Sequence, residues 1–193
     1  MRKNTQAALT DATGNAAPGV RQRVATGLAF LVAGIAVAGW AALVPFVRQR
    51  LAIDDGTLGL LLLCPGVGSI LAMPAAGRAT GRLGCRSVIG VSAALLCAAL
   101  PLLACAPTLW MLGVSLLLSG ASLGALDVAM NVEAVRLEQA AARPLMSGFH
   151  ALYSAGGIIG AGCMSGLLAL GQGPLHAVLW VCLLYTSPSP RDS

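Results

Sequence analysis

The sequence has 193 residues, of which 57% are hydrophobic and only 10% are charged, and its mean hydropathy is +0.82. This composition excludes a water-soluble domain, because apolar stretches long enough to cross a bilayer recur along the chain. The formal charge of +5 does not indicate nucleic-acid binding, since the basic residues lie in short hydrophilic segments between apolar stretches, where they set membrane topology. The sequence therefore predicts an all-α integral membrane protein.

The chain begins with a polar segment and continues with apolar stretches. Residues 1–23 are polar and rich in small residues, which predicts a disordered cytoplasmic tail. The later apolar stretches predict membrane-spanning helices, the fourth of which continues past the membrane to residue 142. The expected spans are about 24–46, 57–76, 87–104, 108–131, 146–170 and 175–181.

The distribution of basic residues predicts the orientation in the membrane. Nine of the Lys and Arg residues lie in the tail and in the second and fourth connections, whereas only Arg48 and Arg50 lie on the opposite side. Cytoplasmic loops carry the excess of Lys and Arg, so we expect the amino terminus in the cytoplasm. The expected location is a bacterial inner membrane.

The sixth apolar stretch is incomplete. About ten apolar residues at about 1.5 Å each cover roughly half of a bilayer core before a Pro-containing segment interrupts them. Residues 182–193 resemble one reading frame of a transposase adapter from sequencing libraries, so we expect them to be non-native and the sixth helix to be truncated. The alternative is a genuine short tail on a half-inserted helix.

The most informative polar residues lie in the fourth stretch. Residues 108–126 carry no charge, after which Asp127 appears, with Asn131 one helical turn later on the same face. A carboxylate in a membrane helix is costly and usually faces a wet cavity, where it serves an ion or proton pathway. The alternative is that Asp127 marks the cytoplasmic end of the span, among the lipid headgroups.

Three further side chains are candidates for a solute cavity. His150 is one turn from Ser154, so both could line the same cavity as Asp127. The alternative for His150 is a position at the cytoplasmic interface, bonded to a neighbouring backbone. Trp40 lies near the end of its span, where it is either a cavity aromatic or an interfacial anchor. Six scattered cysteines lack any CxxC spacing, and we expect no cofactor or metal.

The connection between the second and third spans carries a family pattern. It keeps Gly77, Arg82, Gly84 and Arg86 of the pattern Gly-x-Leu-Ala-Asp-Arg-x-Gly-Arg-Arg, with Gly81 at the aspartate position. Six spans joined by this turn resemble the amino-terminal half of a major facilitator superfamily transporter. The resemblance implies a six-helix half of that fold, in which this turn gates the cytoplasmic side against a carboxy-terminal six-helix half.

Residues 127–131, Asp-Val-Ala-Met-Asn, are similar to the fourth-helix Glu-Thr-Ala-Ala-Asn of the fucose–proton symporter branch of this superfamily. Residues 143–154 are similar to the start of the fifth helix in its sugar-permease-like relatives. The resemblance implies alternating access, with Asp127 coupling the movement of a small polar, sugar-like solute to protons. The partners then expected are the bilayer, the solute, protons and the missing half, with no nucleic acid.

Two other functions stay open from the sequence. One is an intramembrane serine hydrolase, because Ser122, Ser147 or Ser154 could supply a nucleophile and His150 a base. The other is a small membrane subunit that transports nothing, which would apply if the chain ends at Ser193. Neither has a motif in its favour.

Overall fold

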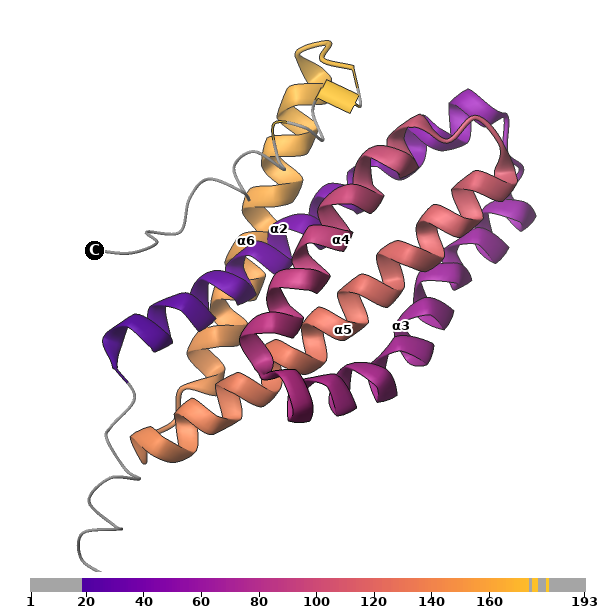
Figure 1. Cartoon of the computed structure of the whole chain (residues 1–193). Helices are drawn as coiled ribbons and strands as arrows, with labels where there is room; N and C mark the ends of the chain where they lie inside the picture. Colours follow the sequence, from indigo (N-terminus) through magenta and orange to yellow (C-terminus); the bar gives the residue numbers. More distant parts are fainter. Residues whose placement is uncertain (1–18, 174, 177–179, 181–193) are drawn as a thin grey trace, which may run out of the picture.

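The computed structural model describes residues 19–173, 175, 176 and 180 (Figure 1). Five long helices make up this part of the chain, and each is long and apolar enough to cross a membrane. The chain is therefore a multi-pass membrane protein, as its composition predicts. The helices are α2 (Val20–Leu51), α3 (Asp55–Leu83), α4 (Cys85–Cys105), α5 (Leu109–Ala141) and α6 (Met146–Ala169).

Five of the six expected spans are observed. The predicted sixth span falls mostly outside the described residues, as do residues 1–18 of the predicted tail and all of 182–193. The tail prediction is wrong at its end, because α2 begins at Val20 and residues 20–23 are helical. The extension of the fourth helix to residue 142 agrees closely with α5, which ends at Ala141.

The glycine-rich turn predicted at 77–86 is wrong in extent, because α3 continues through Leu83. Inside this segment the Thr80 hydroxyl donates to the Gly77 carbonyl at 2.8 Å, which keeps the threonine compatible with the helix. The break comes at Gly84, whose φ of 82° favours glycine. Upstream, α3 contains two prolines, Pro65 and Pro74, each of which removes a backbone donor from the helix.

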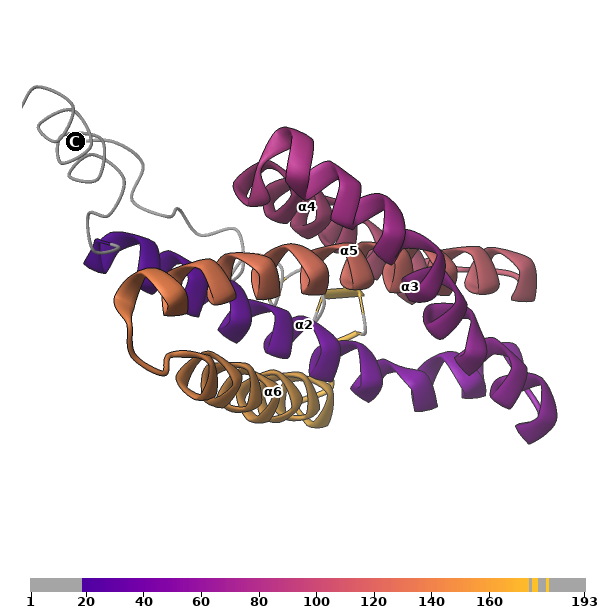
Figure 2. The same cartoon turned by 90° about the horizontal axis from the view of Figure 1, so that it is seen from below.

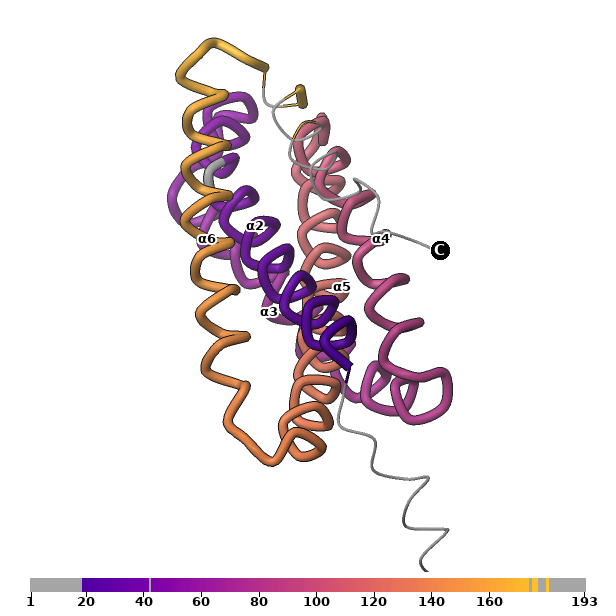
Figure 3. Tube along the Cα trace, turned by 90° about the vertical axis from the view of Figure 1, so that its left-hand side faces the viewer, coloured from indigo at the N-terminus to yellow at the C-terminus, as the bar shows by residue number. Residues whose placement is uncertain are grey.

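The helices form two parallel pairs. Short connections reverse the chain between successive helices, so α2 runs parallel to α6, and α3 runs parallel to α5. These two pairs make the most extensive contacts in the fold, together with α4 on α5. Figures 2 and 3 show α6 and α4 at opposite edges, with α2 and α5 between them. The described fold is thus a layered bundle with α5 at its centre.

Glycines let the helices of the first pair touch through their backbones. Gly34 of α2 lies against the backbone of Tyr153, and Gly156 and Gly160 of α6 lie against α2 on either side of Gly34. A Cβ at any of the three would overlap backbone atoms of the other helix. Small residues permit this close approach in membranes, where apolar burial gives helices little reason to associate.

The second pair repeats this arrangement. Gly68 of α3 meets the backbone of α5, while Gly120 and Gly124 of α5 meet Pro65 and Ser69 of α3. In both pairs, two glycines of one helix (α6 or α5) meet two residues of the other helix (α2 or α3). These two residues stand three positions before and one position after the contact glycine of their own helix, which is Gly34 or Gly68. The same packing register therefore holds both pairs together.

Polar contacts tie the ends of three helices at one face of the bundle. The guanidinium of Arg50, near the end of α2, donates to the carbonyls of Ala104 and Ala106, the latter at 2.6 Å. Arg48 forms an ion pair with Asp55 at 2.5 Å, which joins α2 to the start of α3. A cluster of buried apolar side chains, including Leu43 and Leu103, lies beneath these contacts.

The glycine packing predicts that Gly156→Ala destabilises the bundle. The new methyl group would overlap the α2 backbone, and overpacking of this kind costs about 1–3 kcal/mol. Thermal unfolding of the purified protein in detergent should show a lower melting temperature. The matched control is Gly162→Ala in the same helix, where nothing lies within 4 Å of an added Cβ. Equal effects of the two substitutions would contradict this packing.

The amino terminus of α3 is capped by Asp54. One carboxylate oxygen accepts the Thr57 backbone N–H at 3.0 Å, and the other accepts the Thr57 hydroxyl at 2.6 Å. These bonds hold the pKa of Asp54 below its usual range. A carboxylate whose pKa is lowered by folding stabilises the fold above its unfolded pKa, and this contribution disappears as the pH falls through the folded pKa.

We therefore expect Asp54→Ala to lower the melting temperature at neutral pH, with a difference from the parent chain that shrinks towards about pH 3. The measurement is thermal unfolding across this pH range. Asp54→Asn, which keeps an acceptor oxygen for the Thr57 N–H but loses the acceptor for the Thr57 hydroxyl, should fall between the parent and Asp54→Ala at neutral pH. A difference between Asp54→Ala and the parent that persists undiminished at acidic pH would refute the role of the ionised carboxylate.

Candidate functional site

The predicted coupling residue, Asp127, lies deep in the bundle. At 1.5 Å of rise per residue it is roughly 27 Å from the first residue of α5 and roughly 21 Å from the last. Its neighbours Leu126 and Met130 are fully buried in a cluster that also contains Phe30 of α2 and Phe149 of α6. Asp127 itself is half-buried, beside this cluster.

Asn131 holds the Asp127 carboxylate from one turn away. Its amide nitrogen donates to the Asp127 Oδ1 at 3.1 Å and to the Asp127 backbone carbonyl at 2.9 Å. Within the described residues no hydrogen bond engages the other carboxylate oxygen or the Asn131 amide oxygen. The pair therefore keeps one free acceptor on each side chain, which is what binding a proton or a hydroxyl group requires.

Tyr153 of α6 lies near this pair, across the helix interface. It is half-buried and packs against the cluster that contains Leu126 and Met130, the residues one position before and three positions after Asp127. A phenol beside a carboxylate can donate a hydrogen bond to it or accept one from its protonated form. The glycine contact fixes the position of Tyr153 relative to α2, because the Tyr153 backbone is the surface against which Gly34 packs.

His150 lies one turn before Ser154 on α6, as predicted, but its ring contacts an aromatic side chain. Phe30 stacks on Phe149, with ring centroids 5.5 Å apart, and meets the His150 ring edge-on at 5.4 Å. The imidazole itself is exposed on this part of the chain. Phe30 therefore links His150 to the apolar cluster that supports Asp127.

The serine hydroxyls are bonded to their own helices. Ser154 donates to the His150 backbone carbonyl at 3.1 Å, and Ser122 donates to the Leu118 carbonyl at 2.8 Å. Within the described residues no serine hydroxyl is bonded to the His150 ring, so the nucleophile and base of a hydrolase are not assembled. The part of the chain that the structure describes also holds no group of three or more His, Cys, Asp and Glu suited to a metal.

Trp40 lies in a different region from Asp127. Its side chain packs against the second apolar cluster, beside Leu58 and Leu61 of α3, near the end of the bundle where Arg50 binds. The indole N–H is buried and has no hydrogen-bond partner within the described residues. Trp40 thus lies apart from the group formed by Asp127, Asn131 and Tyr153.

The predicted gating residues lie at the other end of the bundle. Arg82 and Arg86 are exposed on either side of Gly84, at the junction of α3 and α4. Cys85 follows Gly84, and its buried sulfur accepts a hydrogen bond from Arg136 of α5 at 3.3 Å. This bond ties α4 to α5 where the family pattern has an arginine.

Two structural residues were missed from the sequence. Phe30 carries no polar group and gives no signal of its contact with His150. Glu138 accepts the backbone N–H groups of Leu145 and Met146, each at 2.7 Å, and so fixes the start of α6 relative to α5. Tyr153 could have been flagged, because it is three residues from His150 and four from Gly157, on one helical face.

Comparison with known proteins assigns this chain to a family of transporters. Residues 26–187 match the family described as Major Facilitator Superfamily. An uncharacterized MFS-type transporter of Yersinia pestis is 51% identical over 86% of this chain. The uncharacterized transporter y4wD of Sinorhizobium fredii and the membrane protein MosC of Rhizobium meliloti are 37% and 35% identical, each over 68% of the chain.

The chain spans 44%, 35% and 32% of the lengths of these three relatives, respectively. No solved structure matches the chain.

The site geometry predicts that water reaches position 127 but not position 122. In full-length protein lacking its native cysteines, Asp127→Cys should react with a water-soluble maleimide, because thiols react as thiolates. Ser122→Cys is the matched control on the same helix, since the Ser122 side chain is buried among apolar residues. The measurement is the mass of labelled protein, and a cysteine at 127 that stays unlabelled would contradict access of water to the half-buried position 127.

Proposed function

Because the chain belongs to the Major Facilitator Superfamily, we propose that it forms part of a secondary transporter that moves a small polar, sugar-like solute together with protons. The family is one of transporters and not of enzymes, which leaves no place for the hydrolase alternative. The relatives are bacterial, which supports a location in a bacterial inner membrane.

The ends of the helices support an amino terminus in the cytoplasm. Because the helices alternate in direction, the start of α2 and the α3–α4 and α5–α6 connections lie at one end of the bundle. This end carries arginines that include Arg21, Arg82, Arg86 and Arg143, whereas the α2–α3 end carries Arg48 and Arg50. The excess of positive charge belongs on the cytoplasmic side.

The position of Asp127 carries the proposal of proton coupling. The residue follows eighteen uncharged residues of α5, stands six positions before Glu133, the next charged residue of the helix, and is bonded to Asn131. A carboxylate at such a depth is costly, and membrane proteins use such residues in proton and solute pathways. The alternative, a carboxylate among lipid headgroups, fits poorly with a side chain beside fully buried Leu126 and Met130.

The hydrogen bonds suggest how one carboxylate can exchange a proton. Asn131 donates to Oδ1, which is an acceptor whether the group is ionised or protonated. The other oxygen, Oδ2, is then free to take up a proton when the cavity faces one side and to release it when the cavity faces the other. Asn131 thus holds the group in one geometry through both states.

The free groups around Asp127 match the chemistry of a polyhydroxylated solute. The Asn131 amide oxygen can accept from a solute hydroxyl, the Tyr153 hydroxyl can donate or accept, and the Ser154 hydroxyl, which donates to the His150 carbonyl, can accept. The exposed His150 supplies a flat ring of the kind that sugar rings pack against, together with its ring nitrogens, and the fully buried Phe30 supports this ring from within the apolar cluster. In this proposal the site is completed by a carboxy-terminal half, and the two halves rock about it.

Asp127→Asn should abolish proton-coupled uptake and leave solute exchange. The amide cannot exchange a proton, but it keeps an oxygen that can accept from Asn131. The measurement uses the full-length protein in liposomes, with uptake of a panel of radiolabelled monosaccharides driven by a pH gradient and with counterflow at equal pH.

The matched control is Asp54→Asn, which also removes one carboxylate but lies outside the membrane spans. It should leave gradient-driven uptake unchanged. If Asp127→Asn retains pH-dependent uptake, Asp127 is not the coupling residue; if it loses exchange as well, its role is binding or folding.

A further inference from the structure

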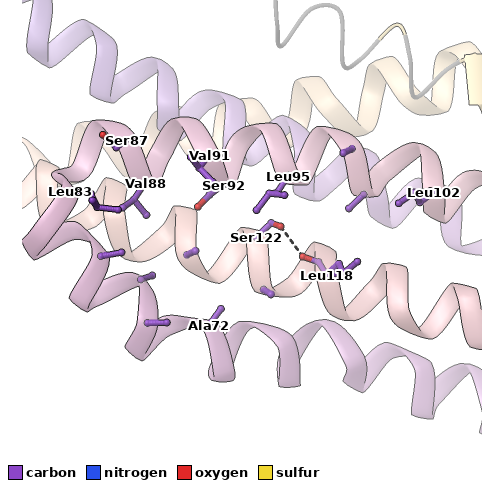
Figure 4. Close-up of a pocket in the computed structure, with 17 residues that line it drawn as sticks. Ala72, Leu83, Ser87, Val88, Val91, Ser92, Leu95, Leu102, Leu118 and Ser122 are labelled. Atoms are coloured by element: carbon purple, nitrogen blue, oxygen red, sulfur yellow. Dashed lines mark hydrogen bonds between the residues drawn. The ribbon is translucent and has the colours of Figure 1, made fainter.

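A groove of about 520 Å³ lies between α3, α4 and α5, on the side of α5 that is turned towards α4 (Figure 4). Figure 4 shows Val88, Ser92 and Leu95 of α4 on one wall, Ser122 on the next helix and Ala72 on the opposite wall. None of the residues of the proposed coupling group lines it. The groove is therefore separate from the proposed solute site.

The lining of the groove is apolar and small. Eight of its 17 residues are alanines, which is why no side chain fills the space between the three helices. The Ser122 hydroxyl at its wall is already bonded to the Leu118 carbonyl, so it offers no unpaired donor. The exposed side chains of Val91, Leu95 and Leu102 face a membrane and not water, so the ligand that fits this lining is a hydrocarbon chain.

The cytoplasmic end of the groove is positively charged. Its last lining residues, Ala79, Leu83 and Ser87, are each preceded in the sequence by an arginine. These arginines, Arg78, Arg82 and Arg86, are all exposed.

In the part of the chain that the structure describes, none of these arginines forms an ion pair with a carboxylate. The ion pair found there joins Arg48 and Asp55, at the opposite end of the bundle. Arg78 has one hydrogen bond, to the Pro74 carbonyl of its own helix at 3.4 Å. Glu133 of α5 lies near Cys85, whose sulfur accepts a hydrogen bond from Arg136, and it forms no ion pair with the three arginines. Exposed arginines that are not paired with a carboxylate suit a phosphate group.

We propose that this groove binds an anionic phospholipid, with an acyl chain along α3, α4 and α5 and the headgroup phosphate on Arg82 and Arg86. From Ser87 to Leu102 the groove follows α4 for roughly 22 Å, which exceeds the roughly 15 Å half-thickness of a bilayer core. The groove is therefore long enough to hold the whole length of one acyl chain of the cytoplasmic leaflet. Basic sites between helices on that side recognise anionic headgroups.

The test is native mass spectrometry of the full-length protein taken from bilayers of equal parts phosphatidylglycerol and phosphatidylcholine with identical acyl chains. The parent protein should retain phosphatidylglycerol selectively. Arg82→Gln/Arg86→Gln should lower this retention by about five-fold for each arginine removed. Ala75→Leu/Ala98→Leu, which narrows the groove from two helices and leaves the arginines in place, should also lower it.

The matched control is Arg21→Gln/Arg143→Gln, which removes the same charge from exposed sites at the same end of the bundle. It should retain phosphatidylglycerol as the parent does. An equal loss in this control would show a general charge effect and overturn the proposal. Three further outcomes would also overturn the proposal. They are retention of both lipids without selectivity, full retention by the alanine-to-leucine variant, and no retained lipid because another part of the protein fills the groove. Lipid retention is independent of transport, so this test stands apart from that of Asp127.

Discussion

Direct backbone contact at glycines is the interaction on which the rest of this bundle depends. In a bilayer, helices cannot be driven together by apolar burial, so close packing and polar contacts must hold them. Gly34, Gly156 and Gly160 bring α2 and α6 together, and Gly68, Gly120 and Gly124 do the same for α3 and α5. Two tight parallel pairs result, and α5 is the helix through which they meet α4.

This packing also builds the candidate site. Asp127 and Tyr153 lie on different helices, and both adjoin one apolar cluster in which Phe30 of α2 packs with Leu126 and Met130 of α5 and Phe149 of α6. Only Asn131 acts on Asp127 from within the same helix. The side chains of this site come from helices and not from the short connections between them, so the packing of the helices sets the geometry of the site.

The sequence predicted features that follow from local residue patterns, such as the helices, and it missed contacts between residues that are distant in the chain. Hydropathy located five helices, and the spacing of Asp127 and Asn131 correctly placed them on one face. Hydropathy could not locate helix ends, since helices extend past the apolar core: α3 runs to Leu83 through a segment that reads as a glycine-rich turn. The contacts of Phe30 and Cys85 could not be foreseen, because the residues they meet are more than fifty positions away.

The polar contacts at the ends of the bundle are unevenly distributed among the helices. Hydrogen bonds of Arg50 join α2 to the end of α4, that of Arg136 joins α5 to α4, and those of Glu138 join α5 to the start of α6. Beyond Pro74, within the described residues, no side-chain hydrogen bond or ion pair joins α3 to another helix, and the proline removes one backbone hydrogen bond of α3 itself. A movement of the last turns of α3 would therefore break no side-chain hydrogen bond between helices, unlike a movement of the ends that Arg50, Arg136 and Glu138 hold.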